Sequence, residues 1–109
     1  MTSLFDREFK KNLEENTINK CIDNITKKYL NDYKNDRQYI NSYNEWYHLL
    51  EEWVNDYVGN INMELADLFL HKYCHKYNLK SNYNVNDLIL NRKRIANILF
   101  NNIYNILIH

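Results

Sequence analysis

The sequence lacks the residues that break helices and build tight turns. It contains no proline, and its only glycine is Gly59. A sheet protein built on short hairpins draws heavily on both residue types. The best helix former, alanine, is also scarce and occurs only at Ala66 and Ala96, so weaker helix formers take its place. The absence of chain breakers predicts an all-helical protein.

Neither sign of charge is in excess, because the chain carries 14 basic and 14 acidic residues. A formal net charge of zero argues against a general polyanion binder and against a strongly acidic protein. The charge is nevertheless unevenly spread: residues 1–35 sum to +1, residues 36–60 to −4 and residues 61–109 to +3. The middle of the chain is therefore acidic and its end basic.

Cysteine is limited to Cys21 and Cys74, both inside apolar helical patterns. The chain starts without the charged and apolar regions of a secretion signal, so we expect reduced core thiols and a cytoplasmic location. One buried disulfide is the alternative if the protein is secreted. The most apolar run, residues 95–108, is interrupted by four asparagines and is too polar and too short to span a bilayer. We expect no membrane partner.

The residues that are abundant point to a globular protein from an AT-rich genome. Hydrophobic residues make up 45% of the chain and aromatic residues 15%, which is more than disordered chains carry. Asparagine occurs 20 times and tyrosine ten times, and both have AT-rich codons, as do lysine and isoleucine. A phage, a mobile element of a low-GC bacterium or a eukaryotic parasite is the expected source.

The clearest pattern is an aromatic stripe in the middle of the chain. Its members recur at steps of three and four, and they are Tyr39, Tyr43, Trp46, Leu50, Trp53 and Tyr57. A second row follows one place later and comprises Ile40, Tyr47, Val54 and Val58. This spacing places all ten side chains on one face of an α-helix. It predicts a helix over residues 37–58, capped by Asn35 or Asp36 and ended by Gly59 in the left-handed conformation.

Four further segments carry helical patterns behind capping residues. We predict helices over residues 4–15 behind Ser3 and Asp6, about 17–34 behind Thr17, and 63–77 behind Asn62. The last helix runs to about residue 107 and opens at Asn84 with Asp87, or at Asn86 alone. One long kinked helix through residues 4–34 is the alternative for the first two. The predicted fold is an all-α, single-domain bundle of four to five helices with a long central amphipathic helix.

Several residues have the spacing of catalytic or metal sites without the rest of the motif. His71, Cys74 and His75 lie on one helical face, but a zinc site needs a fourth ligand and the chain has no paired Cys or His motif. Glu45 and His48 form a single Glu-x-x-His step, whereas di-iron bundles carry two. One glycine cannot build a phosphate loop, and no nucleophile has a base beside it. We therefore expect no metal, no cofactor and no enzymatic activity.

The leading functional prediction is a protein–protein interaction module. The stripe residues expected in the core are Tyr43, Trp46, Leu50 and Trp53. The margin left for a partner consists of Tyr47, Glu51, Glu52, Asp56 and Tyr57. Tyrosine and tryptophan favour interfaces because they combine contact area with a polar tip. The expected partner is a second copy of the chain or another protein. In the latter case the chain is an accessory subunit or inhibitor of a larger machine, such as one that handles nucleic acid.

The alternative prediction is a small nucleic-acid-binding protein that uses the C-terminal half. Its candidate residues are Lys72, Lys76, Lys80, Arg92, Lys93 and Arg94. Two helices with basic residues on the second have the outline of a helix-turn-helix, although the loop of about nine residues exceeds the usual three or four. Nearby tyrosines, Tyr73, Tyr77 and Tyr83, are available to stack on single-stranded bases.

Overall fold

A computed structural model describes residues 3–36, 41–80 and 84–108 of the chain. Within these residues there are five α-helices and no β-strand. The helices are α1 (Leu4–Glu15), α2 (Ile18–Asp36), α3 (Tyr43–Val58), α4 (Met63–Lys76) and α5 (Leu88–Ile108). The predicted all-α bundle with a central amphipathic helix is confirmed.

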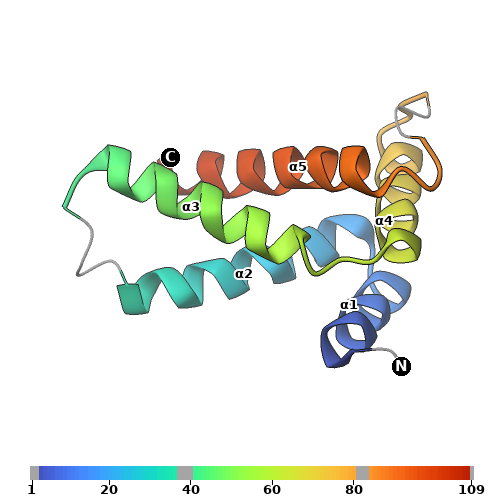
Figure 1. Cartoon of the computed structure of the whole chain (residues 1–109), viewed down its shortest axis with the longest axis horizontal. Helices are drawn as coiled ribbons and strands as arrows, with labels where there is room; N and C mark the ends of the chain where they lie inside the picture. The colour runs from blue at the N-terminus through green and yellow to red at the C-terminus, as the bar shows by residue number, and fades with distance from the viewer. Residues whose placement is uncertain (1–2, 37–40, 81–83, 109) are drawn as a thin grey trace.

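The three longest helices, α2, α3 and α5, lie alongside one another (Figure 1). In this view α3 runs opposite to both α2 and α5, and α4 stands across one end of the three, with α1 at the same end (Figure 1). Helix α5 contacts α2, α3 and α4, and α4 contacts α1, α2 and α5. The molecule measures 40 × 33 × 24 Å along its principal axes.

Three of the predicted helix starts are confirmed by their capping hydrogen bonds. The side chains of Ser3, Thr17 and Asn62 each accept a hydrogen bond from the backbone N–H three residues later, at 3.1, 3.2 and 2.9 Å. Such caps satisfy one of the N–H groups that have no partner in the first turn of a helix. Because Thr17 begins a new helix, residues 4–34 form two helices rather than one kinked helix.

The predicted caps of the central helix are wrong, because Asn35 and Asp36 belong to the end of α2. The described part of α3 begins at Tyr43, one residue after Ser42. The Ser42 hydroxyl accepts from the backbone N–H of Glu45 at 3.2 Å, and the Glu45 carboxylate accepts from the backbone N–H of Asn41 at 3.0 Å. This reciprocal arrangement resembles a capping box. The proposed start at residue 37 and the stripe positions Tyr39 and Ile40 lie outside the described residues.

Gly59 ends α3 as predicted, but its backbone is right-handed, with φ −62° and ψ −17°. Its N–H donates to the carbonyl of Asn55 at 2.9 Å, which continues the last turn. A Cβ at this position would lie 3.2 Å from the Asn55 carbonyl oxygen and 3.4 Å from that of Asp56. Close approach of the backbone, and not a positive φ, therefore favours glycine here.

The cap of the last helix lies three residues after Asn84 and one residue after Asn86, the two predicted caps. The Asp87 carboxylate accepts from the backbone N–H of Leu90 at 3.1 Å, so Asp87 is the cap rather than Asn84 or Asn86. Asn86 instead adopts a positive φ of 66° in the turn before the helix. Asparagine tolerates this conformation better than most residues, which explains its place in the turn.

The core is built from residues that repeat at intervals of four on the two helices that pack most closely. On α3 these are Trp46, Leu50, Val54 and Val58. On α5 they are Asn91, Ile95, Leu99 and Ile103. Phe9 and Leu13 of α1, with Leu65 and Phe69 of α4, close the end of this core.

Of the four stripe residues predicted for the core, Tyr43 is exposed, and Trp53 packs against the core but is only partly buried. Tyr43 is 55% exposed, because it is the first residue of α3, and its hydroxyl meets that of Tyr104 at 2.6 Å. Trp53 is only partly buried, because the buried residues of α3 recur at every fourth position and continue through Val54 and Val58. Its indole N–H donates to the Asp32 carboxylate of α2 at 2.9 Å, which gives this side chain a polar partner at the margin.

Candidate functional site

The outer face of α3 carries Glu51, Glu52 and Asp56, and all three side chains are exposed. No lysine or arginine occurs between Tyr43 and Val58. In the described parts of the chain the one ion pair joins Lys10 and Glu64, at 4.0 Å between exposed side chains. The three carboxylates therefore form an acidic face that no described cation of the same chain neutralises.

The two tyrosines predicted beside this face lie on opposite flanks of α3. The Tyr47 ring packs edge-on against Phe100 of α5, with 5.1 Å between centroids. The Tyr57 ring packs edge-on against Phe5 of α1 at 5.2 Å and stacks on Trp53. At 100° per residue, the three acidic positions fall between these flanks. The five predicted interface residues therefore do not form one patch, because Tyr57 is turned toward α1 and Tyr47 toward α5.

Tyr47 and Glu51 line a groove between α3 and α5 that we call the α3–α5 groove. Its cavity of about 260 Å³ is lined by Tyr47, Glu51, Val54, Asn55, Ala96, Asn97, Phe100 and Asn101. Phe100 also stacks on Tyr104 at 5.9 Å, so the aromatic wall continues along α5. The groove combines an exposed carboxylate, two aromatic rings and three amides. This set is suited to a cationic side chain, since carboxylates and aromatic faces both attract guanidinium groups.

Half of the groove was missed by sequence reasoning. Tyr47 and Glu51 belong to the aromatic stripe and the acidic segment, so their local spacing identified them. Phe100 and the amides of Asn97 and Asn101 come from a helix some fifty residues away in the chain. Only the packing of α3 against α5 brings the two sets together.

The six predicted nucleic-acid contacts do not form one exposed surface. Lys72 donates a hydrogen bond to the carbonyl of Leu13, and Arg92 donates two to the carbonyl of Ile61. Arg94 is partly buried. The remaining three, Lys76, Lys80 and Lys93, are exposed. Half of the basic set is thus turned inward.

The candidate metal ligands His71, Cys74 and His75 differ in burial. His71 and His75 are exposed, whereas Cys74 is buried. Among the residues that the structure describes, no three His, Cys, Asp or Glu side chains are close enough to hold a metal ion. Both cysteines are free, and burial raises the pKa of the Cys21 thiol to about 12, although the charge of Lys72 acts to lower it.

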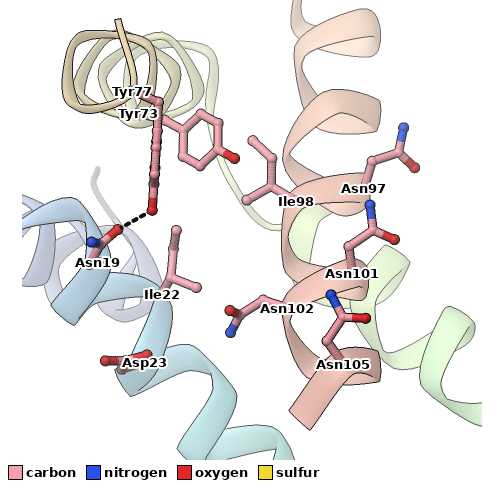
Figure 2. A pocket seen from close by; sticks show the side chains of 10 residues that line it. All are labelled: Asn19, Ile22, Asp23, Tyr73, Tyr77, Asn97, Ile98, Asn101, Asn102 and Asn105. Carbon is pink, nitrogen blue, oxygen red and sulfur yellow. Dashed lines mark hydrogen bonds between the residues drawn. The ribbon is translucent and has the colours of Figure 1, made fainter. Parts of the chain in front are cut away.

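A second, larger cleft lies where α2, α4 and α5 meet, and sequence reasoning did not identify it (Figure 2). Its volume is about 530 Å³. The lining residues are Asn19, Ile22, Asp23, Tyr73, Tyr77, Asn97, Ile98, Asn101, Asn102 and Asn105. The Tyr77 hydroxyl donates to the Asn19 side chain at 2.7 Å and so links α4 to α2 across one end (Figure 2). The lining offers mainly neutral hydrogen-bonding groups, one carboxylate at Asp23 and no cation.

Comparison with known proteins gives no match: no family model, curated protein or solved structure is detectably similar to this chain. None of the described helices has the length and apolar character needed to span a lipid bilayer.

Proposed function

We propose that this protein is a small, non-enzymatic protein–protein interaction module whose α3–α5 groove and acidic face receive a basic segment of another protein. The observation that carries the proposal is Glu51, which stands exposed at the groove beside the Tyr47 and Phe100 rings. Glu52 and Asp56 extend the same sign of charge along the helix. A partner with complementary charge is steered toward such a surface.

An arginine side chain of the partner fits the chemistry of the groove best. Its planar guanidinium forms paired hydrogen bonds with a carboxylate and lies flat against aromatic rings. Glu51 offers the carboxylate, and Phe100 and Tyr47 offer the rings. The amide oxygen of Asn55 is an acceptor for a remaining N–H. Arginine is also the charged residue most enriched in protein interfaces.

The acidic face favours this function over direct binding of nucleic acid. Phosphate groups are repelled by Glu51, Glu52 and Asp56, and Lys72 and Arg92 already donate to backbone carbonyls of the same chain. An acidic surface can instead occupy the basic groove of a nucleic-acid-binding protein and so compete with the nucleic acid for that groove. A role as accessory subunit or inhibitor of a nucleic-acid-handling machine, in the cytoplasm of a cell that carries a phage or mobile element, fits this chemistry.

Selection from a random peptide display library on the immobilised full chain tests the proposal. We expect the enriched peptides to contain arginine, often beside an aromatic residue. Neutralising the face with Glu51→Gln, Glu52→Gln and Asp56→Asn should remove this enrichment. A control with Glu8→Gln, Glu14→Gln and Glu15→Gln makes the same change in net charge at exposed positions of α1 and should retain it.

Two outcomes would overturn the proposal. One is enrichment of the same peptides by the neutralised protein. The other is salt-sensitive binding of single- or double-stranded DNA or RNA in gel shifts, lost when Lys76, Lys80 and Lys93 are replaced by alanine. The second result would restore direct nucleic-acid binding as the function.

A further inference from the structure

A separate pocket of about 260 Å³ lies between α4 and α5 and has a mostly apolar lining. Leu70, Tyr73 and Cys74 line it from α4, Ile98 lines it from α5, and Leu79 lines it from the segment after α4. The charged residue of the lining is Arg94. The pocket contains no acidic residue to balance this charge, and it shares no residue with α3.

Arg94 has a buried donor without an acceptor. Its Nη1 atom is shielded from solvent and has no hydrogen-bond partner among the described residues. Guanidinium groups stay protonated in proteins, so this side chain cannot neutralise itself by losing a proton. A buried donor left unpaired is costly, and most buried polar groups in folded proteins have a partner. Because Arg94 also lines the pocket, its positive charge is available there to an anionic acceptor, which would pair with the accessible part of the guanidinium.

We propose that this pocket binds a carboxylate that carries an apolar substituent. The carboxylate oxygens accept hydrogen bonds from the Arg94 guanidinium, and the substituent packs against Leu70, Leu79 and Ile98. A single cation in an apolar lining suits the one charge of a carboxylate, whereas phosphate sites gather several donors. Ligand pockets are generally apolar with a few placed polar groups, as here. This site shares only Asn97 with the α3–α5 groove and goes beyond the proposed function.

Such a carboxylate has two sources, a free apolar acid or the C-terminal residue of a peptide. The pocket adjoins the amide-lined cleft, since Tyr73, Asn97 and Ile98 line both. The Tyr73 ring and the Ile98 side chain face each other at the border between them (Figure 2). A peptide that ends in the pocket would extend its backbone into the cleft, where asparagine amides both donate and accept hydrogen bonds.

Titration of the isotope-labelled full chain, followed by NMR, tests the site with four probes. They are octanoate, octanamide, acetyl-Gly-Leu with a free carboxylate and the same dipeptide with a C-terminal amide. We expect saturable binding of at least one acid, with shifts at Leu70, Leu79 and Ile98. The matching amide should bind at least about tenfold more weakly, because it lacks the charge that pairs with Arg94. Preference between the two acids identifies the source.

Three variants complete the test. Arg94→Gln should weaken binding of the acid at least about tenfold, while Arg7→Gln, which removes an exposed charge from α1, should not change it. Leu79→Trp, at a position that is 42% exposed, should fill the pocket and block binding without disturbing the core. Bound acid should also slow alkylation of Cys74, a measurement that does not depend on Arg94 variants.

The proposal is overturned if no acid shows saturable binding, or if amides bind as tightly as acids. It is also overturned if Arg94→Gln, once shown to be folded, binds like the wild type. Should Arg94→Gln fail to fold, the comparison of acid with amide and the Leu79→Trp variant decide the question.

Discussion

Arg92 donates two hydrogen bonds to the backbone carbonyl of Ile61, at 2.8 Å from Nε and 2.6 Å from Nη2. Ile61 is fully buried in the turn between α3 and α4. One side chain of α5 therefore fixes the turn that joins the two helices packed against it. A residue that the basic pattern predicted for nucleic-acid contact stabilises the fold instead.

Replacement of Arg92 by alanine should lower the free energy of unfolding by about 1.5 to 3 kcal/mol, because hydrogen bonds from a charged donor contribute this much. Lys93→Ala removes the adjacent exposed charge and should change the free energy by less than about 0.5 kcal/mol. Urea denaturation followed by circular dichroism measures both. Equal effects of the two substitutions would contradict the structural role of Arg92.

Replacement of the buried Asn91 side chain should lower the free energy of unfolding by a similar amount. Its amide donates to the Asp67 carboxylate at 3.0 Å and to the Asn84 carbonyl at 2.8 Å, which ties α5 to α4 and to the turn before α5. Asn91→Ala removes both bonds and leaves a cavity, so we expect a loss of roughly 1 to 3 kcal/mol. Asn97→Ala, at an exposed position of the same helix, is the matched control and should unfold at the wild-type urea midpoint.

Stability should fall at alkaline pH because the buried Cys21 thiol and the partly buried Tyr57 hydroxyl resist ionisation. Burial raises the pKa of Cys21 to about 12 from an ordinary value of 9.0, and burial also raises the pKa of Tyr57, with Cys21 and Glu8 adding to the rise. The unfolded chain releases these protons first, so the stabilisation is complete below about pH 9 and is lost as pH rises toward 12.

The variant Tyr57→Phe tests this dependence, because it keeps the ring against Phe5 and removes the hydroxyl. Between pH 7 and pH 11 the variant should lose about 1 kcal/mol less stability than the wild type. Urea midpoints at the two pH values provide the measurement. An identical loss in both proteins would show that Tyr57 ionises as freely in the folded chain as in the unfolded one.

Replacement of Arg94 by an apolar residue of similar length should not lower the free energy of unfolding, in contrast to the replacement of Arg92. Arg94→Met removes a buried unpaired donor while it keeps most of the packing volume, so stability should stay equal or rise by about 1 kcal/mol. Thermal denaturation of the ligand-free protein measures the change. A loss above about 1 kcal/mol would mean that Arg94 has a stabilising partner within the chain.

The fold was largely predictable because helix signals are local. Residues within one or two helical turns are enough to predict the aromatic stripe, the stop at Gly59 and the caps Ser3, Thr17 and Asn62. The start of α3 was predictable too, since Ser42 and Glu45 have the spacing of a capping box, but the apolar periodicity at Tyr39 and Ile40 outweighed that signal.

The sites were less predictable because they depend on which helices touch. Glu51 was identified from charge alone, whereas Phe100 and Asn97 join it only through the packing of α3 on α5. The inward roles of Arg92 and Lys72 were hidden for the same reason, as their acceptors lie 31 and 59 residues away. A run of basic residues in a sequence does not show which of them reach solvent.

The affinity of an arginine-containing peptide selected by the display experiment tests the central claim that the α3–α5 groove receives a basic partner. Isothermal titration at low and high salt should compare the wild type with Glu51→Gln and with the control Glu15→Gln. We predict that Glu51→Gln weakens binding at least about tenfold, that salt weakens the wild-type complex, and that Glu15→Gln changes neither. Equal affinity of the wild type and Glu51→Gln would contradict the account.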